Sequence, residues 1–81
     1  MELKLEKELV KILRRKGIYR DSLTFDINQV GIGWQLIVTS EIGKFSIKLK
    51  TGEVKTYRTL NTVGRRLKAF GIKQFTVNLS E

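Results

Sequence analysis

The chain has 81 residues, of which 16 are Lys or Arg and 8 are Asp or Glu, and it contains no cysteine, histidine or proline. Its length fits one small basic domain, residues 1–81. The missing cysteine and histidine exclude disulfides, thiolate nucleophiles and the usual ligands of transition metals, so we expect no cofactor. No apolar run approaches the roughly 20 residues of a membrane span, and the first residues have no signal-peptide pattern. We therefore expect a soluble, cytoplasmic protein.

Positive charge is concentrated in one part of the chain. The net charge is +8, and residues 44–73 alone carry nine basic residues minus one acidic residue, which is again +8. Residues 21–43 contain no basic residue. This segregation favours a polyanionic partner such as DNA or RNA. The alternative is a basic surface that only keeps the protein in solution.

An amphipathic helix is predicted over residues 2–17. Its apolar residues recur at helical spacing and share one face: Leu5, Leu9, Ile12 and Leu13. Acidic residues come early and basic residues late, which suits the helix dipole. Gly17 is placed to end the helix in a left-handed conformation.

Two strands are predicted next, joined by a glycine-rich turn. Apolar side chains alternate with polar ones at Leu23, Phe25 and Ile27, and then at Trp34, Leu36 and Val38. Gly31 and Gly33 mark the turn between the two strands. Ile37 lies on the opposite face from its apolar neighbours, which indicates local cover or a central position in the sheet.

The stretch 44–58 alternates in the same way on both sides of Gly52. It predicts a third strand over 44–50, a turn in which Gly52 has positive φ, and a fourth strand over 53–58. With a two-residue loop, Lys48 faces Lys55 and all the basic side chains share the open face. A one-residue bulge at Gly52 would instead turn the fourth strand over.

A second helix is predicted over 59–71 and a closing strand over 73–79. Thr59 or Asn61 is expected to cap the helix, and Gly71 is expected to end it. Gly64 inside the helix indicates close approach of another element.

The predicted fold class is therefore α+β, in the order α-β-β-β-β-α-β. We expect a two-layer sandwich in which both helices cover one face of a mixed sheet. The last strand is expected to follow a parallel crossover through the second helix. The core is predicted to contain Leu9, Ile12, Phe25, Leu36, Ile47, Leu49, Leu67, Phe70, Phe75 and Val77.

No catalytic constellation stands out in the sequence. The carboxylates are scattered singly, and no serine has a histidine base. We therefore expect a protein that is not an enzyme.

The candidate site is a basic face on the hairpin around Gly52. It consists of Lys44, Lys48, Lys50, Lys55 and Tyr57, flanked by Arg65, Arg66 and Lys68 on the second helix. Lysine and arginine neutralise phosphates, and a tyrosine ring among them can stack on a base. The structural alternative is that these residues serve β-propensity and protect a sheet edge.

The run "TGEVKTYRTLNTVGRRLKAFGIKQFTV" resembles small plasmid-encoded replication- or partition-associated proteins. In those proteins a basic hairpin leads through "TL" into a short helix that ends in glycine, and a strand follows. The resemblance covers about the last third of the chain, includes no catalytic motif and implies a mobile-element accessory protein that acts near nucleic acid. There is also an analogy to three-stranded DNA binders of the integrase-arm type, which end in the helix.

Two functions follow from these patterns. The first is a non-enzymatic nucleic-acid-binding module that uses a basic sheet face. The second is a small protein–protein interaction domain, in which an open sheet face or edge strand pairs with a partner or with a second copy. Salt dependence distinguishes them, because phosphate binding weakens steeply with salt and a packed protein interface does not.

Overall fold

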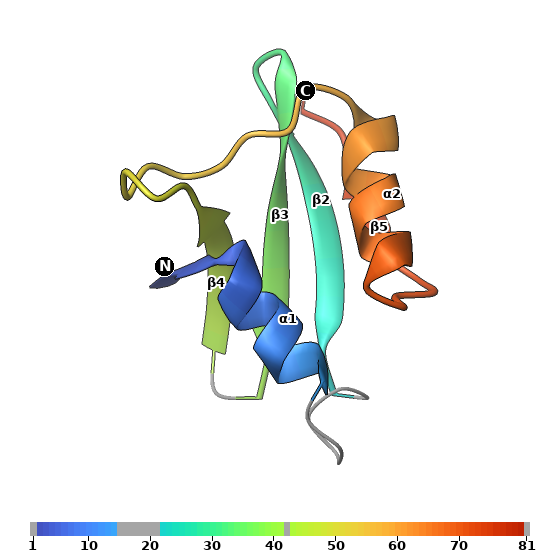
Figure 1. Cartoon of the computed structure of the whole chain (residues 1–81). Coiled ribbons are helices and arrows are strands. Elements are labelled where there is room, and N and C mark those ends of the chain that lie inside the picture. The colour runs from blue at the N-terminus through green and yellow to red at the C-terminus, as the bar shows by residue number, and fades with distance from the viewer. Residues whose placement is uncertain (1, 15–21, 42, 81) are drawn as a thin grey trace.

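The computed structural model describes residues 2–14, 22–41 and 43–80, which form a five-stranded sheet and two helices (Figure 1). The strands are β1 (Glu2–Leu5), β2 (Thr24–Val30), β3 (Gly33–Ser40), β4 (Gly43–Lys48) and β5 (Thr76–Asn78). The helices are α1 (Glu6–Arg14) and α2 (Leu60–Ala69). The strands are arranged in the order β1-β4-β3-β2-β5, so β3 is central.

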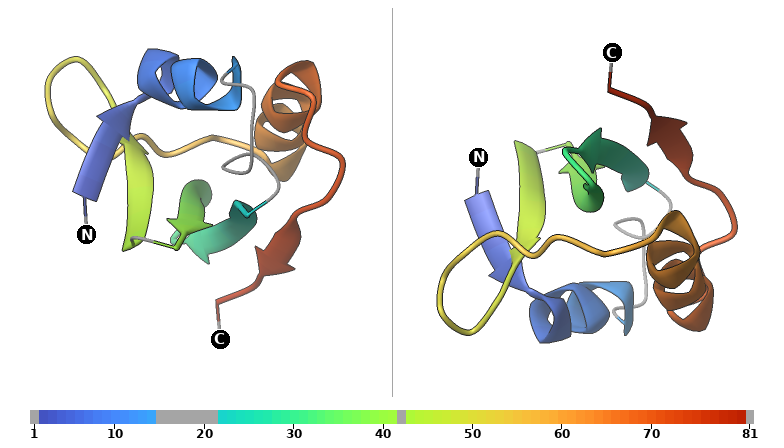
Figure 2. Two further views of the ribbon diagram at one scale, coloured as in Figure 1. Left: turned by 90° about the horizontal axis from the view of Figure 1, so that it is seen from below. Right: turned by 90° about the horizontal axis from the view of Figure 1, so that it is seen from above.

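The sheet is mixed, and both helices cover the same face of it (Figure 2). Strands β2, β3 and β4 form an antiparallel meander, while β1 is parallel to β4 and β5 is parallel to β2 at the two edges. Each helix therefore lies in a crossover between parallel strands, α1 between β1 and β2 and α2 between β4 and β5. The predicted two-layer α+β class and the mixed five-stranded sheet are confirmed.

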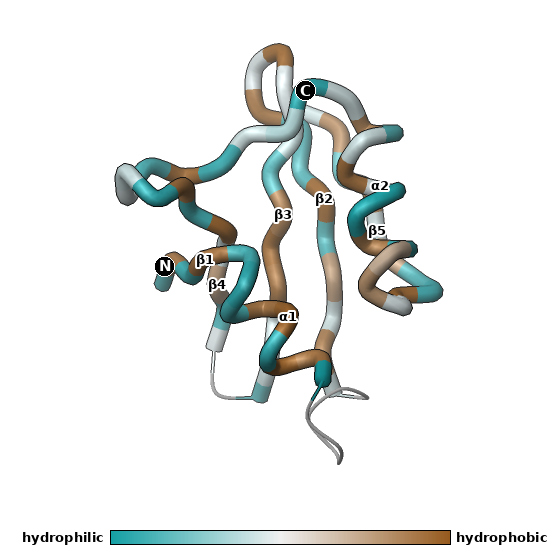
Figure 3. Tube along the Cα trace, viewed as in Figure 1, coloured by the Kyte–Doolittle hydropathy of each residue, from teal (hydrophilic) through white to brown (hydrophobic). Residues whose placement is uncertain are grey.

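The core lies between the helices and the sheet (Figure 3). Its buried members are Leu9 and Leu13 of α1, Val63 and Leu67 of α2, and Phe25, Ile27, Leu36, Val38, Phe45, Ile47 and Tyr57 below them. Three residues of the predicted core are instead exposed, since Leu49 is 42%, Phe75 39% and Val77 36% accessible. Leu49 lies beyond the end of β4, just before the turn at Gly52. The other two belong to the short edge around β5.

The first residues form an edge strand where the sequence predicts helix. Leu3 pairs with Ser46 in the parallel ladder between β1 and β4. Helix α1 then begins at Glu6, and the carboxylate of Glu8 accepts a hydrogen bond from the Leu5 amide at 3.3 Å. This contact satisfies one of the amides that a helix start leaves unpaired. The predicted helix end at Gly17 lies outside the described residues.

The segment 53–58 is extended but pairs at only two points. Lys48 bridges Val54, and Trp34 bridges Tyr57. If the segment 53–58 is counted as a strand, the elements from α1 onward follow the predicted order α-β-β-β-β-α-β. Strand β1 is an additional element before α1. The turn before it is wider than a two-residue loop, because the Leu49 amide donates to the Glu53 carbonyl at 2.7 Å. Gly52 has the predicted positive φ, at 94°.

Helix α2 begins and ends as the sequence predicts. The Thr59 side chain caps it by accepting a hydrogen bond from the Thr62 amide at 3.1 Å. Gly71 follows the helix with φ of 85°, a conformation that favours glycine. A Cβ at Gly64 would lie 3.7 Å from the ring of Phe75, so the helix does approach the segment leading to β5.

Gly33 is required by close packing between β3 and the segment 53–58. A Cβ there would lie 2.3 Å from Cγ2 of Thr56 and 3.0 Å from the Tyr57 carbonyl oxygen. We expect Gly33→Ala to reduce the free energy of unfolding by roughly 1–3 kcal/mol through overpacking, measured by urea denaturation. Adding Thr56→Ser, which removes Cγ2, should restore part of the loss. An alanine variant as stable as the wild type would contradict this packing.

Candidate nucleic-acid interface

The predicted basic face is divided between the two sides of the sheet. Lys44 and Lys48 alternate along β4 with buried apolar residues, so they point away from the helices. Lys50 is exposed in the turn. Lys55 and Tyr57 lie on the side that the helices cover, which corrects the prediction that they share the open face. The wider turn is the reason, because one added residue turns the following segment over.

Tyr57 is a core residue. It is 4% exposed, and its backbone exchanges two hydrogen bonds with Trp34, at 2.7 and 2.8 Å. Its hydroxyl donates to Oε2 of Glu6 at 3.4 Å. Burial raises the pKa of Tyr57 above its ordinary value of 10.0. The ring is therefore not placed to stack on a base.

Glu6 joins three segments that are distant in sequence. Its Oε2 lies 3.0 Å from Nζ of Lys55, and its Oε1 forms an ion pair with Arg66 of α2. The Lys55 ammonium also lies 4.9 Å from the centroid of the Tyr57 ring. We call Glu6, Lys55, Tyr57 and Arg66 the Glu6 cluster. It uses two of the predicted phosphate-binding cations to hold α1, α2 and the segment 53–58 together.

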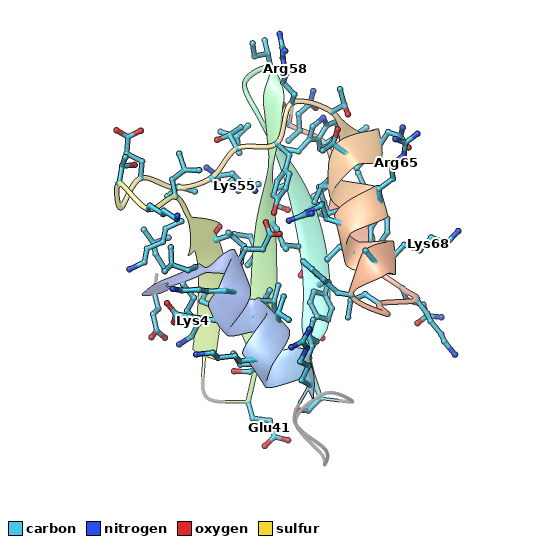
Figure 4. All side chains as sticks on the ribbon, in the orientation of Figure 1. Lys4, Glu41, Lys55, Arg58, Arg65 and Lys68 are labelled. Atoms are coloured by element: carbon cyan, nitrogen blue, oxygen red, sulfur yellow. The ribbon has the colours of Figure 1, made fainter. Side chains whose placement is uncertain are left out.

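Two of the remaining predicted cations, Arg65 and Lys68, point outward from α2 (Figure 4). Arg65 and Lys68 are exposed three residues apart, and Arg58 is exposed just before the Thr59 cap. Lys73 is exposed after the helix. We call Arg58, Arg65, Lys68 and Lys73 the helix-side basic surface. Arg58 and Lys73 were not among the predicted site residues, although the absence of any acidic residue from 54 to 80 marks this segment in the sequence.

Apart from Lys44 and Lys48 on β4, the open face of the sheet is mostly uncharged. One row crosses all five strands at Leu3, Ser46, Ile37, Asp26 and Thr76. Its centre is closed, since Ser46 is 2% and Ile37 8% exposed. The central position of β3 thus explains the apolar Ile37. A face with this composition does not form a continuous cationic platform.

A cavity of about 480 Å³ lies beside β1, α1 and the β3–β4 turn. Its charged lining residues are Glu2, Glu8, Glu41, Lys4, Lys11 and Lys44. Because its lining combines three acidic with three basic residues, this cavity does not favour a polyanion.

Comparisons with family models, curated proteins and solved structures found no match for this chain. In the described part of the chain, no group of three acidic, histidine or cysteine residues is placed to hold a metal ion. Neither described helix is long and apolar enough to cross a membrane.

The Glu6 cluster makes a prediction about stability. We expect Glu6→Gln to lower the free energy of unfolding by roughly 1–2 kcal/mol, because half-buried Lys55 loses its counter-charge. The loss should shrink at high salt. Glu53→Gln, at an exposed turn position, is the matched control and should change little. Equal stability of the two variants in urea titrations would show that the cluster contributes nothing.

The raised pKa of Tyr57 predicts a loss of stability at alkaline pH. The unfolded chain ionises this tyrosine near pH 10.0, whereas the folded chain keeps it neutral until its higher pKa is reached. The stabilisation is therefore fully present below pH 10.0 and is lost as pH rises through the folded pKa. Tyr57→Phe should show a smaller fall in unfolding free energy across that window. Parallel curves for the two proteins would refute this assignment.

Proposed function

We propose that this protein is a non-enzymatic, cytoplasmic nucleic-acid-binding module that contacts phosphates through the helix-side basic surface. One observation carries the proposal. The exposed cations Arg58, Arg65, Lys68 and Lys73 have no acidic partner among the described residues, and the segment 54–80 that carries them contains six basic residues and no acidic residue.

The division of the cations supports this assignment. Lys55 and Arg66 both form ion pairs with Glu6, so their charge contributes to the fold. The cations along α2 instead face water, where only salt ions screen them. Helix α2 also has no acidic residue in its first turn, so nothing offsets the positive end of its dipole beside Arg58. A phosphate chain laid along α2 would meet Arg58 before the first turn, Arg65 in the middle and Lys68 in the last turn.

The biological setting follows from the resemblance of residues 51–77 to plasmid-encoded replication- or partition-associated proteins. We propose an accessory role on a mobile element, in which a small basic protein holds DNA or RNA without altering it chemically.

Protein–protein association is the second candidate, and one observation favours it. The edge at β5 exposes Phe75, Val77 and Leu79, the last of them 71% accessible. An edge strand with apolar side chains can pair with another chain. Sedimentation of the protein over a range of concentrations checks this candidate directly, since pairing through β5 predicts a dimer whose stability depends little on salt.

Two matched charge reversals test the proposed site. Arg65→Glu with Lys68→Glu should weaken binding to duplex DNA and flatten the plot of log K against log salt by up to about 2, because each phosphate contact contributes about 0.9. Lys44→Glu with Lys48→Glu changes the net charge equally on the opposite face and should have a much smaller effect. Fluorescence anisotropy at several salt concentrations measures both, and thermal unfolding confirms that both variants fold.

The outcomes separate the possible sites. A larger loss from the Lys44 and Lys48 reversal would return the site to the open sheet face. Equal small losses from both pairs would mean that neither face binds nucleic acid specifically.

A further inference from the structure

Ile32 at the tip of the β2–β3 hairpin is fully exposed, with a relative accessibility of 101%. Val30 pairs with Gly33, so the loop consists of Gly31 and Ile32 alone. Gly31 has φ of 59° and Ile32 does not have positive φ, which defines a type II′ turn. Such a turn requires glycine at its first central position and makes no demand for an apolar residue at the second. The fold therefore gives no reason for an isoleucine here.

The tip is held in place by its base. Trp34 and Tyr57 exchange backbone hydrogen bonds at 2.8 and 2.7 Å, and Gly33 packs directly against Thr56. Tyr57 is itself fixed in the core and in the Glu6 cluster. An exposed side chain on so constrained a support keeps its position relative to the rest of the protein. Figure 3 shows the hydrophobic tip projecting beyond the sheet.

One basic residue, Arg58, lies beside the tip (Figure 4). Continuing the antiparallel register from Trp34 and Tyr57 places Arg58 opposite Gly33, and Figure 4 shows Arg58 beside the hairpin. No acidic residue occurs between Asp26 and Glu41. The hairpin thus presents the fully exposed Ile32, with Val30 45% exposed beside it, at the end of the helix-side basic surface.

We propose that Ile32 is an apolar wedge that enters between adjacent base pairs of duplex nucleic acid, and this inference rests on the proposed function. Proteins that bend DNA insert isolated apolar side chains in this way, and the partly unstacked step kinks. Pyrimidine–purine steps are flexible, so they are unstacked and kinked most readily. Phosphate contacts by Arg58 and α2 would hold the duplex while Ile32 separates one step.

Other occupants fit the tip less well. Proteins that anchor at a bilayer surface use several apolar side chains and aromatic residues in the interface, whereas this turn has no aromatic residue and a single fully exposed aliphatic one. A stable contact between two copies buries about 800 Å² on each partner, which one isoleucine does not supply. One narrow apolar side chain matches one opened base step.

The test uses the full chain and a duplex of about 20 base pairs with one central TA step and a dye at each end. Energy transfer between the dyes should increase when wild-type protein binds, because the duplex bends. Ile32→Ser should weaken binding roughly tenfold and abolish the increase, while the salt slope stays unchanged. Leu49→Ser is the matched control, since Leu49 is 42% exposed and precedes the turn after β4, which Figure 1 shows well to one side of the hairpin tip. Leu79 is unsuitable because β5, parallel to β2, brings it to the same end as the tip.

Each result supports or overturns the wedge. Bending by wild type and by Leu49→Ser, but not by Ile32→Ser, supports it. Equal bending by all three proteins overturns it and leaves the proposed function standing. Failure of wild-type protein to bind any duplex overturns the wedge, and failure to bind single strands as well overturns the proposed function. Loss of binding to anionic phosphatidylserine vesicles in Ile32→Ser, with duplex binding unchanged, would assign the tip to a lipid surface instead.

Discussion

The antiparallel pairing of Tyr57 with Trp34 controls the arrangement of everything that follows β4. Beyond Lys48 the chain leaves the sheet, turns at Gly52 and returns beside the first residues of β3, where β4 would otherwise have continued. This return places the Tyr57 ring in the core and directs Lys55 toward Glu6. It also sets Arg58 beside the hairpin and the Thr59 cap at the start of α2. A backbone contact between two residues thus determines which cations are enclosed and which face solvent.

The charged residues consequently have two different roles. The Glu6 side chain is only 17% exposed and forms ion pairs with Lys55 of the segment 53–58 and Arg66 of α2. Those ion pairs are partly shielded from solvent, so salt weakens them less than it weakens exposed pairs. The exposed cations of α2 contribute little to folding and form a one-signed surface. A count of basic residues does not distinguish cations that stabilise the fold from cations that face solvent. The partly buried acidic partner of Lys55 and Arg66 does distinguish them.

The layered α+β architecture could be predicted because period-two and helical patterns are strong in β2, β3 and both helices. The helical pattern extends over residues 2–5 because Leu5 also fits the stripe of α1, whereas these residues form β1. The direction of Lys55 and Tyr57 could not be predicted, since it depends on whether the turn at Gly52 holds two residues or more. The partners of Glu6 lie 49 and 60 residues away along the chain, and no local pattern connects them. The sequence alone does not distinguish Ile32 from the apolar residues of the strands. The turn geometry at Gly31 and Ile32 shows that the fold does not require an apolar residue at Ile32.

The two edge strands have a consequence for how the protein opens. Strands β2, β3 and β4 are joined by short connections, whereas β1 and β5 are each connected to this meander through a helix. The β5 ladder spans only three residues, all of them exposed. Segments with few buried contacts detach at a lower free energy than the rest of the fold, so amide hydrogens in β5 exchange before those of β3. Such local opening uncovers the edge of β2 while the meander and its core remain folded.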